Sequence, residues 1–542
     1  MELKVKGHSG CVIDIVNEGN NLRIHKWSKD PKYLARLAKQ ADKQQKAYKD
    51  EYQHIRIPQI FDVERDDEHV LINMEYVYSR NFIEFFEAAG FEQIDYFIKA
   101  LILFLEKELK ASPVKSVPTS VTLDKYYDVE KKVNANPLLA SDPKIQRLMA
   151  LSRQRFEELA KQSTVDLPMG ICHGDLTFSN ILFNGNNYYL IDFLDSFIES
   201  PLLDIVKIRQ DSAHLWSQLM YMKQYDKLRL KIISEKIDKE IHGYFLQYEW
   251  YKRYYNVYQI LNFLRILQYA KEEKVIAFLK NTIEKLLTLS SVVNDEEKIV
   301  RERDNNVFSL IVPIAADDED HPDKMPYVFC LDNNGVMLCV RAIQGLNLDV
   351  FDEIYFTILR KHAEKFYLPD LFMLQFKRLG IQNAHLVILD EPTHSQVETV
   401  YKTVIRENIR GGIFVKDADG YYKSDVRRDN SVALFTLEQL HMLDPQHKSY
   451  VSVDDMYNLT NIIERKVISH YFNAGGICFD NVDDFLYYYK QLLKENLHIC
   501  MSHIVYSMLL DGKNFRPIIT KDYMDWGSEM LFNYNYYTKQ LQ

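Results

Sequence analysis

Short apolar runs separated by polar turns fill residues 1–80, as in CVIDIV, NLRIHKW and HVLINMEYV. This alternation predicts strands, and a polar helical stretch from Pro31 to Tyr52 interrupts them, so we expect a small sheet with one helix. From about residue 80 to residue 165 the apolar spacing becomes helical. Two short strand-like runs follow, around ICHGD and YYLIDF, and helical spacing then continues to about residue 290.

A charged segment, SSVVNDEEKIVRERDNN, has no apolar face, and we take residues 291–305 within it as a linker. Beyond it the pattern changes. The buried-type runs FSLIVPI, EIYFTIL, AHLVIL and GGIFVKD alternate with helical stretches, which is typical of a mostly parallel α/β sheet. The sequence therefore predicts a two-domain protein of α+β and α/β class, with domains at residues 1–290 and 306–542.

The composition excludes several classes of protein. The 542 residues include 77 acidic and 67 basic side chains, a net charge of −10, which argues against a protein that coats nucleic acid or an anionic membrane. The segment MELKVKGHSG lacks the apolar core of a secretory signal, and no run approaches the ~18 apolar residues of a membrane span. Six scattered cysteines form no CxxC pair. We therefore expect a reduced, cytoplasmic protein, and leave open whether it is a homo-oligomer.

The segment CHGDLTFSN, followed by the turn NGNN and the run YYLIDF, carries the most specific candidate chemistry. Transfer of a γ-phosphoryl group needs a carboxylate to orient the acceptor hydroxyl and oxygen ligands for Mg²⁺. Asp175 supplies that carboxylate, Asn180 on the same loop supplies one metal ligand, and Asp192 at the end of the next strand supplies the second. Each residue alone is better explained as a turn, a cap or an edge-strand carboxylate, but together they favour a kinase active site.

This motif, H-G-D-x-x-x-x-N followed by I-D-[FW], resembles that of the aminoglycoside phosphotransferase and choline kinase family. The resemblance covers about residues 1–290 and implies a bilobal, protein-kinase-like fold with a small lobe at about residues 1–80. It also implies ATP as phosphoryl donor and Mg²⁺ as cofactor. By this resemblance Asp175 is the catalytic carboxylate, and the metal ligands are Asn180 and Asp192.

The same resemblance places the ATP contacts in the small lobe. The turn GHSG between the first two strands would cover the phosphates, through Gly7, Ser9 and Gly10. Lys26, in the run LRIHKW, would contact the α- and β-phosphates. The segment MEYV would be the hinge that binds adenine, through Glu75 and Val77. Each feature is weak alone, because G-x-x-G is common and a strand lysine is usually solvated.

One departure from the family concerns the helix that should present a glutamate to Lys26. It has Gln40 or Gln44 where an acid is expected, and an amide binds an ammonium without neutralising it. The segment after the second metal ligand, DSFIESPLLDIVKIRQD, resembles the family in Asp195 and Asp204. For Asp204 we expect a structural role that braces the catalytic loop.

The acceptor alcohol should bind between the catalytic loop and the helices that follow it. Five tyrosines recur there at steps of four, three, four and three residues, which would place them on one face of one helix beside Trp250. They are Tyr244, Tyr248, Tyr251, Tyr255 and Tyr258. An aromatic face can hold a quaternary ammonium such as choline by cation–π attraction. Packing within the lobe is the simpler explanation, and both interpretations stay open.

In the second half, the strand GGIFVKD runs into the D-x-D sequence of Asp417 and Asp419, and Asp525 precedes a tight turn at Gly527. Transfer of a nucleotidyl group needs a metal that bridges the α-phosphate and the attacking phosphate, usually held by two carboxylates at neighbouring strand ends. A hairpin or Asx turn explains D-x-D-G equally well when it is taken alone.

The order of segments over residues 306–542 resembles the sugar-phosphate nucleotidyltransferase family: SLIVPIAA, DKMPYVFCLDNNG, EIYFTIL, DEPTHSQVET, the D-x-D strand, ERKVI and finally DWG. The resemblance implies a doubly wound, glycosyltransferase-A-like sheet of Rossmann type. It makes Asp419 and Asp525 the metal pair and places Lys466 on the acceptor phosphate. It also aligns Lys324 with the lysine after the triphosphate turn, and it brings the loop of residues 395–399, with Ser395 and Gln396, near the base.

The departure in this half is an acidic turn. The family follows its first strand with G-x-G-x-R, whereas residues 317–322 here are DDEDHP. Four carboxylates in this turn would repel a triphosphate. The half is therefore either a divergent transferase or a former one retained for binding.

Three hypotheses follow. The first is a bifunctional enzyme that phosphorylates a choline-like alcohol, polyol or sugar with ATP and couples the product to a nucleotide with release of pyrophosphate. By resemblance to kinase and cytidylyltransferase pairs, CTP is preferred and UTP is next, with a role in surface-glycan synthesis. The second is a kinase with an inactive, nucleotide-binding C-terminal half. The third, an interaction module on two degenerate folds, is disfavoured because Asp175, Asn180 and Asp192 are all present.

Overall fold

The computed structural model describes residues 3–6, 11–19, 21–288, 306–315, 324–440, 448–495 and 497–537. The chain forms two compact units, one of Met1–Glu87 with Gln93–Glu297 and one of Ala88–Glu92 with Lys298–Gln542. The expected linker at 291–305, the phosphate turn with Gly7, Ser9 and Gly10, and the acidic turn at 317–322 lie outside the described residues.

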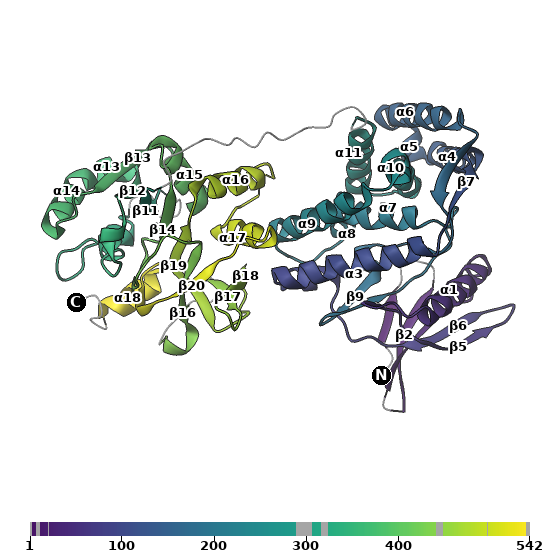
Figure 1. The fold of residues 1–542 in the computed structure, drawn as a ribbon, viewed down its shortest axis with the longest axis horizontal. Helices are drawn as coiled ribbons and strands as arrows, with labels where there is room; N and C mark the ends of the chain where they lie inside the picture. Colours follow the sequence, from purple (N-terminus) through teal and green to yellow (C-terminus); the bar gives the residue numbers. More distant parts are fainter. Residues whose placement is uncertain are drawn as a thin grey trace. The chain divides into compact units, whose positions relative to one another are not determined.

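A five-stranded antiparallel sheet begins the first unit (Figure 1). Its spatial order is β1 (Leu3–Lys6), β2 (Val12–Glu18), β3 (Asn21–Ser28), β6 (Val70–Glu75) and β5 (Ile60–Arg65). Helix α1 (Pro31–Lys49), capped by the Asp30 side chain, buries Tyr33, Leu37 and Ala41 against this sheet. The predicted small sheet with one helix is confirmed. Because β3 is central, Lys26 is held between β2 and β6.

The rest of the first unit is mainly helical. Its helices are α2 (Phe82–Phe86), α3 (Phe91–Lys110), α4 (Thr119–Ala135), α5 (Pro137–Ala140), α6 (Pro143–Ala160), α7 (Pro201–Ser212), α8 (Trp216–Leu219), α9 (Lys227–Phe245), α10 (Glu249–Leu267) and α11 (Glu273–Thr288). A hairpin of β9 (Ile181–Asn184) and β10 (Asn187–Leu190), extended by β4 (Ile55–Arg56), follows the segment CHGDLTFSN. A second pair joins β7 (Val114–Pro118) to β8 (Thr164–Pro168).

The prediction that five tyrosines share one helix is wrong. Tyr244 lies on α9, and Tyr248 is the N-cap of α10 with an extended backbone, φ −98° and ψ 124°. The chain therefore turns between the two helices, and only Tyr251, Tyr255 and Tyr258 share α10. Apolar and aromatic spacing alone does not reveal such a break, because the period is nearly the same on both sides of it.

The second unit is built on a sheet of nine strands (Figure 1). The main path runs β13 (Ala384–Leu389), β12 (Glu353–Leu359), β11 (Phe308–Ile314), β14 (Gly412–Lys416), β19 (Tyr471–Phe479), β16 (Ser431–Thr436) and β20 (Arg516–Ile519). Two more strands, β17 (Ser449–Val453) and β18 (Leu459–Glu464), attach to β19. Its core includes Phe308, Leu310, Phe356 and Phe414.

The expectation of a mostly parallel sheet is only partly right. Strands β13, β12, β11 and β14 are parallel, as the four predicted apolar runs indicated. Beyond β14 the sheet is mixed, since β19 pairs antiparallel with β14, β16 and β17. Parallel pairing needs a crossover connection, usually a helix, and the described residues between β16 and β19 contain no α-helix. The chain instead continues from β16 through β17 and β18 to β19 without a crossover helix among the described residues, and β19 runs antiparallel to β16.

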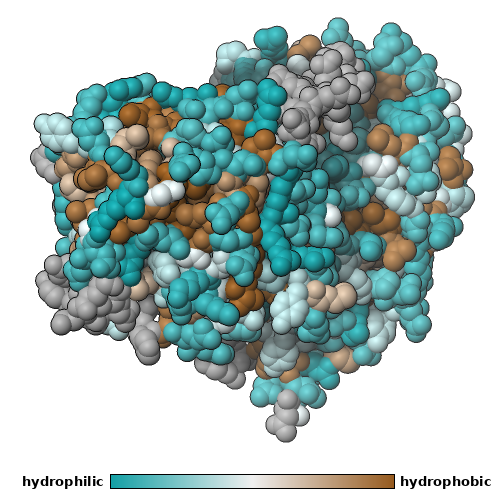
Figure 2. All heavy atoms as spheres, turned by 60° about the vertical axis from the view of Figure 1, so that its left-hand side comes forward, coloured by the Kyte–Doolittle hydropathy of each residue, from teal (hydrophilic) through white to brown (hydrophobic). Residues whose placement is uncertain are grey.

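The helices of the second unit are α12 (Leu338–Arg341), α13 (Arg360–Lys365), α14 (Leu368–Leu379), α15 (Gln396–Arg406), α16 (Val482–Leu493), α17 (Met501–Leu510) and α18 (Glu529–Tyr537). A separate two-stranded sheet pairs β15 (Gly420–Lys423) with β21 (Lys521–Asp525). Among the described helices of the whole chain, none combines the length and the hydrophobicity needed to cross a membrane. The face drawn in Figure 2 is largely hydrophilic, with hydrophobic residues in smaller groups.

Candidate active sites

The catalytic loop of the first unit brings Asp175 and Asn180 into contact. The Asn180 amide Nδ2 donates to Oδ2 of Asp175 at 3.0 Å and to its backbone oxygen at 2.8 Å. Lys207 Nζ, from α7, lies 3.0 Å from Oδ1 of Asp175. Burial alone would raise the pKa of Asp175, but the Lys207 charge and these hydrogen bonds leave it below its ordinary value. Asp175 is therefore a carboxylate at neutral pH, able to accept a hydroxyl proton.

Asp192 follows β10 in a left-handed conformation, φ 63°. Its Oδ1 lies 2.5 Å from Lys26 Nζ, which also donates to Gln40 Oε1 at 3.2 Å. The predicted position of Gln40 beside Lys26 is confirmed, whereas Gln44 donates to the Pro58 oxygen. Burial opposes the charge of Lys26, but Asp192 raises the pKa of the ammonium above its usual value. Lys26 therefore relies on Asp192 for its counter-charge.

Asn180 and Asp192 stand at the start of β9 and just after the end of β10, whose hairpin pairs Leu190 with Ile181. The Ile191 N–H donates to the backbone oxygen of Asn180 at 3.1 Å, and this hydrogen bond connects the two segments. Since the Asn180 Nδ2 donates to Asp175, Oδ1 is the amide atom that would ligate a cation. An amide oxygen and a carboxylate suit Mg²⁺, which takes few protein ligands and completes its shell with phosphates and water. The residues fit that ion, although no cluster of three or more His, Cys, Asp or Glu side chains occurs in the part of the chain that is described.

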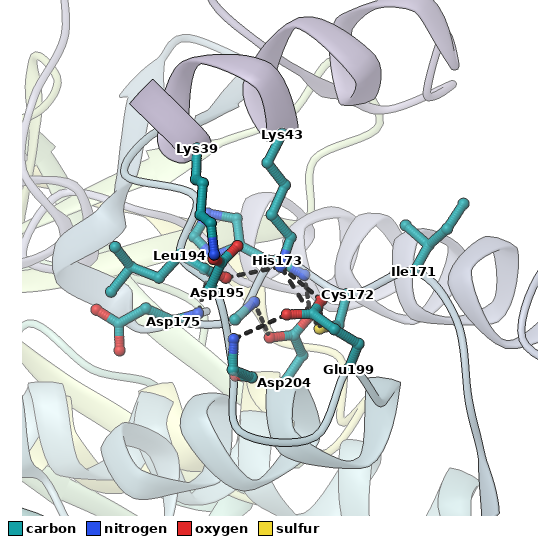
Figure 3. Close-up of polar contacts among 12 residues, drawn as sticks. Lys39, Lys43, Ile171, Cys172, His173, Asp175, Leu194, Asp195, Glu199 and Asp204 are labelled. Atoms are coloured by element: carbon teal, nitrogen blue, oxygen red, sulfur yellow. Dashed lines mark hydrogen bonds and ion pairs between the residues drawn. The ribbon is translucent and has the colours of Figure 1, made fainter. Parts of the chain in front are cut away.

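Buried side chains hold the catalytic loop from below (Figure 3). Gly174 has φ +88°, and a Cβ there would lie 2.0 Å from the Leu194 oxygen, so only glycine fits. Asp204, on α7, accepts from the backbone N–H groups of His173 and Gly174, the latter at 2.7 Å. Its expected bracing role agrees with this geometry.

His173 is neutral, because burial lowers its pKa to about 4. The Asp175 N–H donates to its Nδ1 at 3.2 Å, so Nε2 carries the proton and donates to the Ile191 oxygen at 3.0 Å. The ring therefore links the segment of Asp175 to that of Asp192. His173 is a positioning residue for both carboxylates.

Helix α1 also reaches this segment (Figure 3). Lys43 Nζ donates to the Leu194 oxygen at 2.6 Å and to Glu199 Oε2 at 2.8 Å, and Lys39 pairs with Asp195 at 3.1 Å. Lys43 is one turn from Gln40 on α1. This helix therefore positions both Gln40, which contacts Lys26, and the loop that follows Asp192.

Sequence reasoning missed Lys43, Lys207 and Asp211. Asp211 accepts from the Phe178 N–H at 2.7 Å and from the Ser217 N–H at 2.9 Å, and so supports the loop at its other end. A signal for two of these residues existed: Asp204, Lys207 and Asp211 recur at helical spacing, which puts three charged groups on one face of α7 toward the loop.

The predicted adenine hinge follows β6. The Glu75 N–H donates to the Gln59 oxygen at 2.8 Å, and its carboxylate accepts from the Gln59 N–H at 3.1 Å. Val77 lies two residues beyond the strand and is half-buried. Their role in binding adenine stays a prediction.

The tyrosines of α10 have partners within the protein. Arg209, on α7, donates to the Tyr251 hydroxyl at 2.8 Å, and its guanidinium lies 4.4 Å from the Tyr255 ring centroid. Tyr258 bonds Thr122 at 2.9 Å. An arginine already occupies the aromatic face, which favours packing over a choline cage.

In the second unit, Asp419 and Asp525 come together. β15 and β21 pair Gly420 with Asp525, and the Trp526 N–H donates to the Asp419 oxygen at 2.8 Å. A Cβ at Gly527 would lie 2.5 Å from Asp419 Oδ2 and 3.3 Å from Asp525 Oδ1. The two carboxylates therefore flank the same point of the backbone, as the D-x-D and DWG segments predicted.

A lysine that the sequence did not single out joins this pair. Lys448 Nζ lies 2.5 Å from Asp525 Oδ2 and 2.9 Å from the Tyr523 hydroxyl. Burial and the neighbouring Asp417 raise the pKa of Asp419. Burial would also raise that of Asp525, but Lys448 lowers it below the ordinary value. Two neighbouring carboxylates, one of them paired with Lys448, fit a divalent cation that replaces the charge of that lysine.

The other predicted residues of this unit lie as follows. Lys466 is exposed between β18 and β19. Lys324 is 2.6 Å from the Tyr327 hydroxyl and 3.6 Å from Glu529. Ser395 caps α15 and Gln396 begins it, donating to Asp417. The segment expected as a loop is thus a helix N-terminus from Gln396 onward, and the ligand roles of these residues stay predictions.

Comparison with known proteins adds the following. Residues 21–227 match the model of the phosphotransferase enzyme family. No curated protein matches the chain. The nucleoside-diphosphate-sugar pyrophosphorylase of Vibrio cholerae RC9 is 13% identical over 42% of this chain and 98% of its own, with a TM-score of 0.35. The inositol-1-phosphate CTP transferase of T. maritima is 15% identical over 44% of this chain and 95% of its own, with a TM-score of 0.33. A protein of Haemophilus somnus 129PT named as a fructosamine-3-kinase is 14% identical over 53% of this chain and 91% of its own, with a TM-score of 0.33.

The family match includes Lys26, Asp175, Asn180 and Asp192, the residues whose contacts were described above. Residues 21–227, less than half of the chain, are therefore similar to the phosphotransferase enzyme family.

Proposed function

We propose that the chain is a bifunctional enzyme, a small-molecule kinase followed by a nucleotidyltransferase. The observation that carries the first activity is the contact of Asp175 with Asn180 and of Asp192 with Lys26 in one site. The observation that supports the second is the meeting of Asp419 and Asp525 beside Lys448.

In the first step, the hydroxyl oxygen of an alcohol attacks the γ-phosphorus of ATP. The new O–P bond forms as the bond to the β-phosphate oxygen breaks, ADP leaves, and Asp175 accepts the hydroxyl proton. Lys26, paired with Asp192, and Lys207, paired with Asp175, are the ammonium groups that would offset negative charge on the transferred group. Mg²⁺ held by Asn180 and Asp192 would neutralise the phosphates.

In the second step, a phosphate oxygen of the product attacks the α-phosphorus of a nucleoside triphosphate and pyrophosphate leaves. Lys448 would bind that phosphate or the leaving group, and Mg²⁺ held by Asp419 and Asp525 would offset the charge at the α-phosphate. CTP is the preferred nucleotide and UTP the next, on the resemblance given above. Choline-like alcohols, polyols and sugars are the acceptor classes, and surface-glycan synthesis is the proposed setting.

A second candidate function is a kinase whose C-terminal half binds a nucleotide without transferring it. The specific observation in its favour is the ion pair of Lys448 with Asp525, which occupies one of the two proposed metal ligands. The acidic sequence at 317–322 points the same way.

The deciding experiment supplies the full-length protein with ATP, Mg²⁺, a panel of alcohols and each of the four nucleoside triphosphates, and measures ADP and pyrophosphate separately. Asp175→Ala should abolish alcohol-dependent ADP release, while the exposed Asp124→Asn should leave it unchanged. Asp525→Ala should abolish pyrophosphate release alone. Formation of ADP without pyrophosphate under all conditions would establish the second candidate instead.

A further inference from the structure

A small pocket opens beside the catalytic carboxylate in the first unit. Gly174 and Phe197 line it from the loops, Lys207 from α7, and Tyr258 and Arg265 from α10. Its volume is about 10 Å³, which is room for roughly one water-sized group. The pocket therefore has room for one oxygen atom of an acceptor group, and Lys207 in its lining connects it to Asp175.

Arg265 is the unusual member of this pocket. It is only partly exposed, and its guanidinium lies 5.2 Å from the Phe197 ring centroid. No described carboxylate lies within ion-pair distance of Arg265, and its side chain makes no hydrogen bond to any described residue. Arg209, by contrast, is buried with two contacts to Asp238, at 2.7 and 2.8 Å. A charge that is partly buried without a counter-ion lowers the stability of the folded protein. The environment of Arg265 therefore lacks an anion.

The other charges nearby do not complete it. Lys207 is also cationic and is paired with Asp175 at 3.0 Å. Burial lowers the pKa of Arg265, the positive charge of Arg36 on α1 acts in the same direction, and the Asp175 carboxylate only partly opposes them. Lys207 and Arg265 are thus two cations that both interact with the Asp175 carboxylate. A quaternary ammonium in this pocket would meet like charges at short range.

We propose that Arg265 binds an anionic group of the acceptor, so that the kinase substrate is an alcohol that carries a carboxylate or a phosphate. This inference rests on the proposed kinase function and narrows its acceptor class. A guanidinium donates charge-assisted hydrogen bonds to the oxygens of either group. Phe197 stacks on the guanidinium and fixes its direction, while Lys207 stays with Asp175. The aromatic face that suggested choline is filled by Arg209 instead.

The test compares four acceptors of similar size with the full-length protein: glycerol, glycerate, glycerol 3-phosphate and choline. ADP release is measured with each at saturating ATP and Mg²⁺. The expected kcat/KM is highest for glycerate or glycerol 3-phosphate, and whichever of the two is better distinguishes a carboxylate from a phosphate ligand. Arg265→Gln should raise KM for the anionic acceptor at least about 10-fold, the value of a charged hydrogen bond. It should leave KM for ATP near that of the wild type, and Arg265→Lys should restore part of the affinity.

Arg253→Gln is the matched control, since Arg253 lies on the same helix with its side chain 69% exposed. It should behave as wild type. Equal or faster turnover of choline or glycerol than of both anionic acceptors would overturn the inference while leaving the kinase function standing. The inference would also be overturned if Arg265→Gln raised KM for ATP with every acceptor, because Arg265 would then bind the nucleotide. Absence of acceptor-dependent ADP release above the Asp175→Ala background would overturn the kinase function itself.

Discussion

Lys26 Nζ lies 2.5 Å from Oδ1 of Asp192, 166 residues further along the chain. This contact joins the central strand of the small sheet to the loop that carries the proposed metal ligand. In a kinase site the lysine serves the phosphates and is oriented by an acid on the neighbouring helix. Here that helix offers only the amide of Gln40. The metal ligand therefore also serves as the counter-ion of the lysine.

Gln40→Glu should reduce the Mg²⁺ concentration needed for half-maximal phosphoryl transfer several-fold. A carboxylate at this position would pair with Lys26 and release Asp192 for the metal. The measurement is a Mg²⁺ titration of ADP release at fixed ATP and acceptor concentrations. Gln154→Glu, which adds the same charge at an exposed position of α6, should not change the titration. An unchanged or increased Mg²⁺ requirement in Gln40→Glu would contradict this account of the Lys26 environment.

Lys43→Met should raise KM for ATP about 10-fold and lower the stability of the first unit by ~1–3 kcal/mol, because Glu199 and the Leu194 oxygen lose a charged donor. The loop after Asp192 would then no longer be tied to α1. Steady-state kinetics and urea unfolding measure the two effects. Lys49→Met, exposed at the end of the same helix, is the control. A loss of stability with an unchanged KM would reduce Lys43 to a purely structural role.

The pH dependence of stability should reveal Asp211. Burial raises its pKa to about 6, above the ordinary value of an unfolded chain, so the folded state favours the protonated carboxyl. Its contribution is fully present below about pH 4 and is lost as the pH rises through 6. The unfolding free energy of the wild type relative to Asp211→Asn should therefore fall by about 3 kcal/mol between pH 4 and pH 7. Urea titrations of both proteins across this range measure it, and a difference that stays flat or grows with pH would refute the shift.

Lys448→Met should destabilise the second unit by about 3 kcal/mol without metal, since the Asp525 carboxylate then loses the ammonium that lies 2.5 Å from it. Mg²⁺ should recover much of that loss, because the cation then supplies the missing charge. Thermal unfolding with and without Mg²⁺ measures both effects. Lys423→Met removes an exposed ion pair with Asp522 and should cost less than about 1 kcal/mol. Failure of Mg²⁺ to stabilise Lys448→Met more than the wild type would argue against a metal site between Asp419 and Asp525.

The sequence alone determined the features that local geometry controls. Asp175, Asn180 and Asp192 lie within one loop and hairpin, so their spacing fixes their relative positions before the rest of the chain is considered. Four strands of the second unit, β11 to β14, could also be predicted, because each is a continuous apolar run between turns. Gln40 or Gln44 could be placed near Lys26 because they belong to the same strand–helix unit, and the structure selects Gln40.

Only the tertiary structure decided which distant side chains complete each site. Lys448 lies 75 residues before Tyr523, and Lys207 and Arg265 reach the pocket beside Asp175 from two different helices; no spacing rule connects such positions. The direction of β19 depended on how the meander folds, and the series of tyrosines was broken by a turn that leaves the period almost unchanged. Charged groups in particular find their partners through the packing of whole elements, so their pairing is fixed by the assembled core and not by the order of residues.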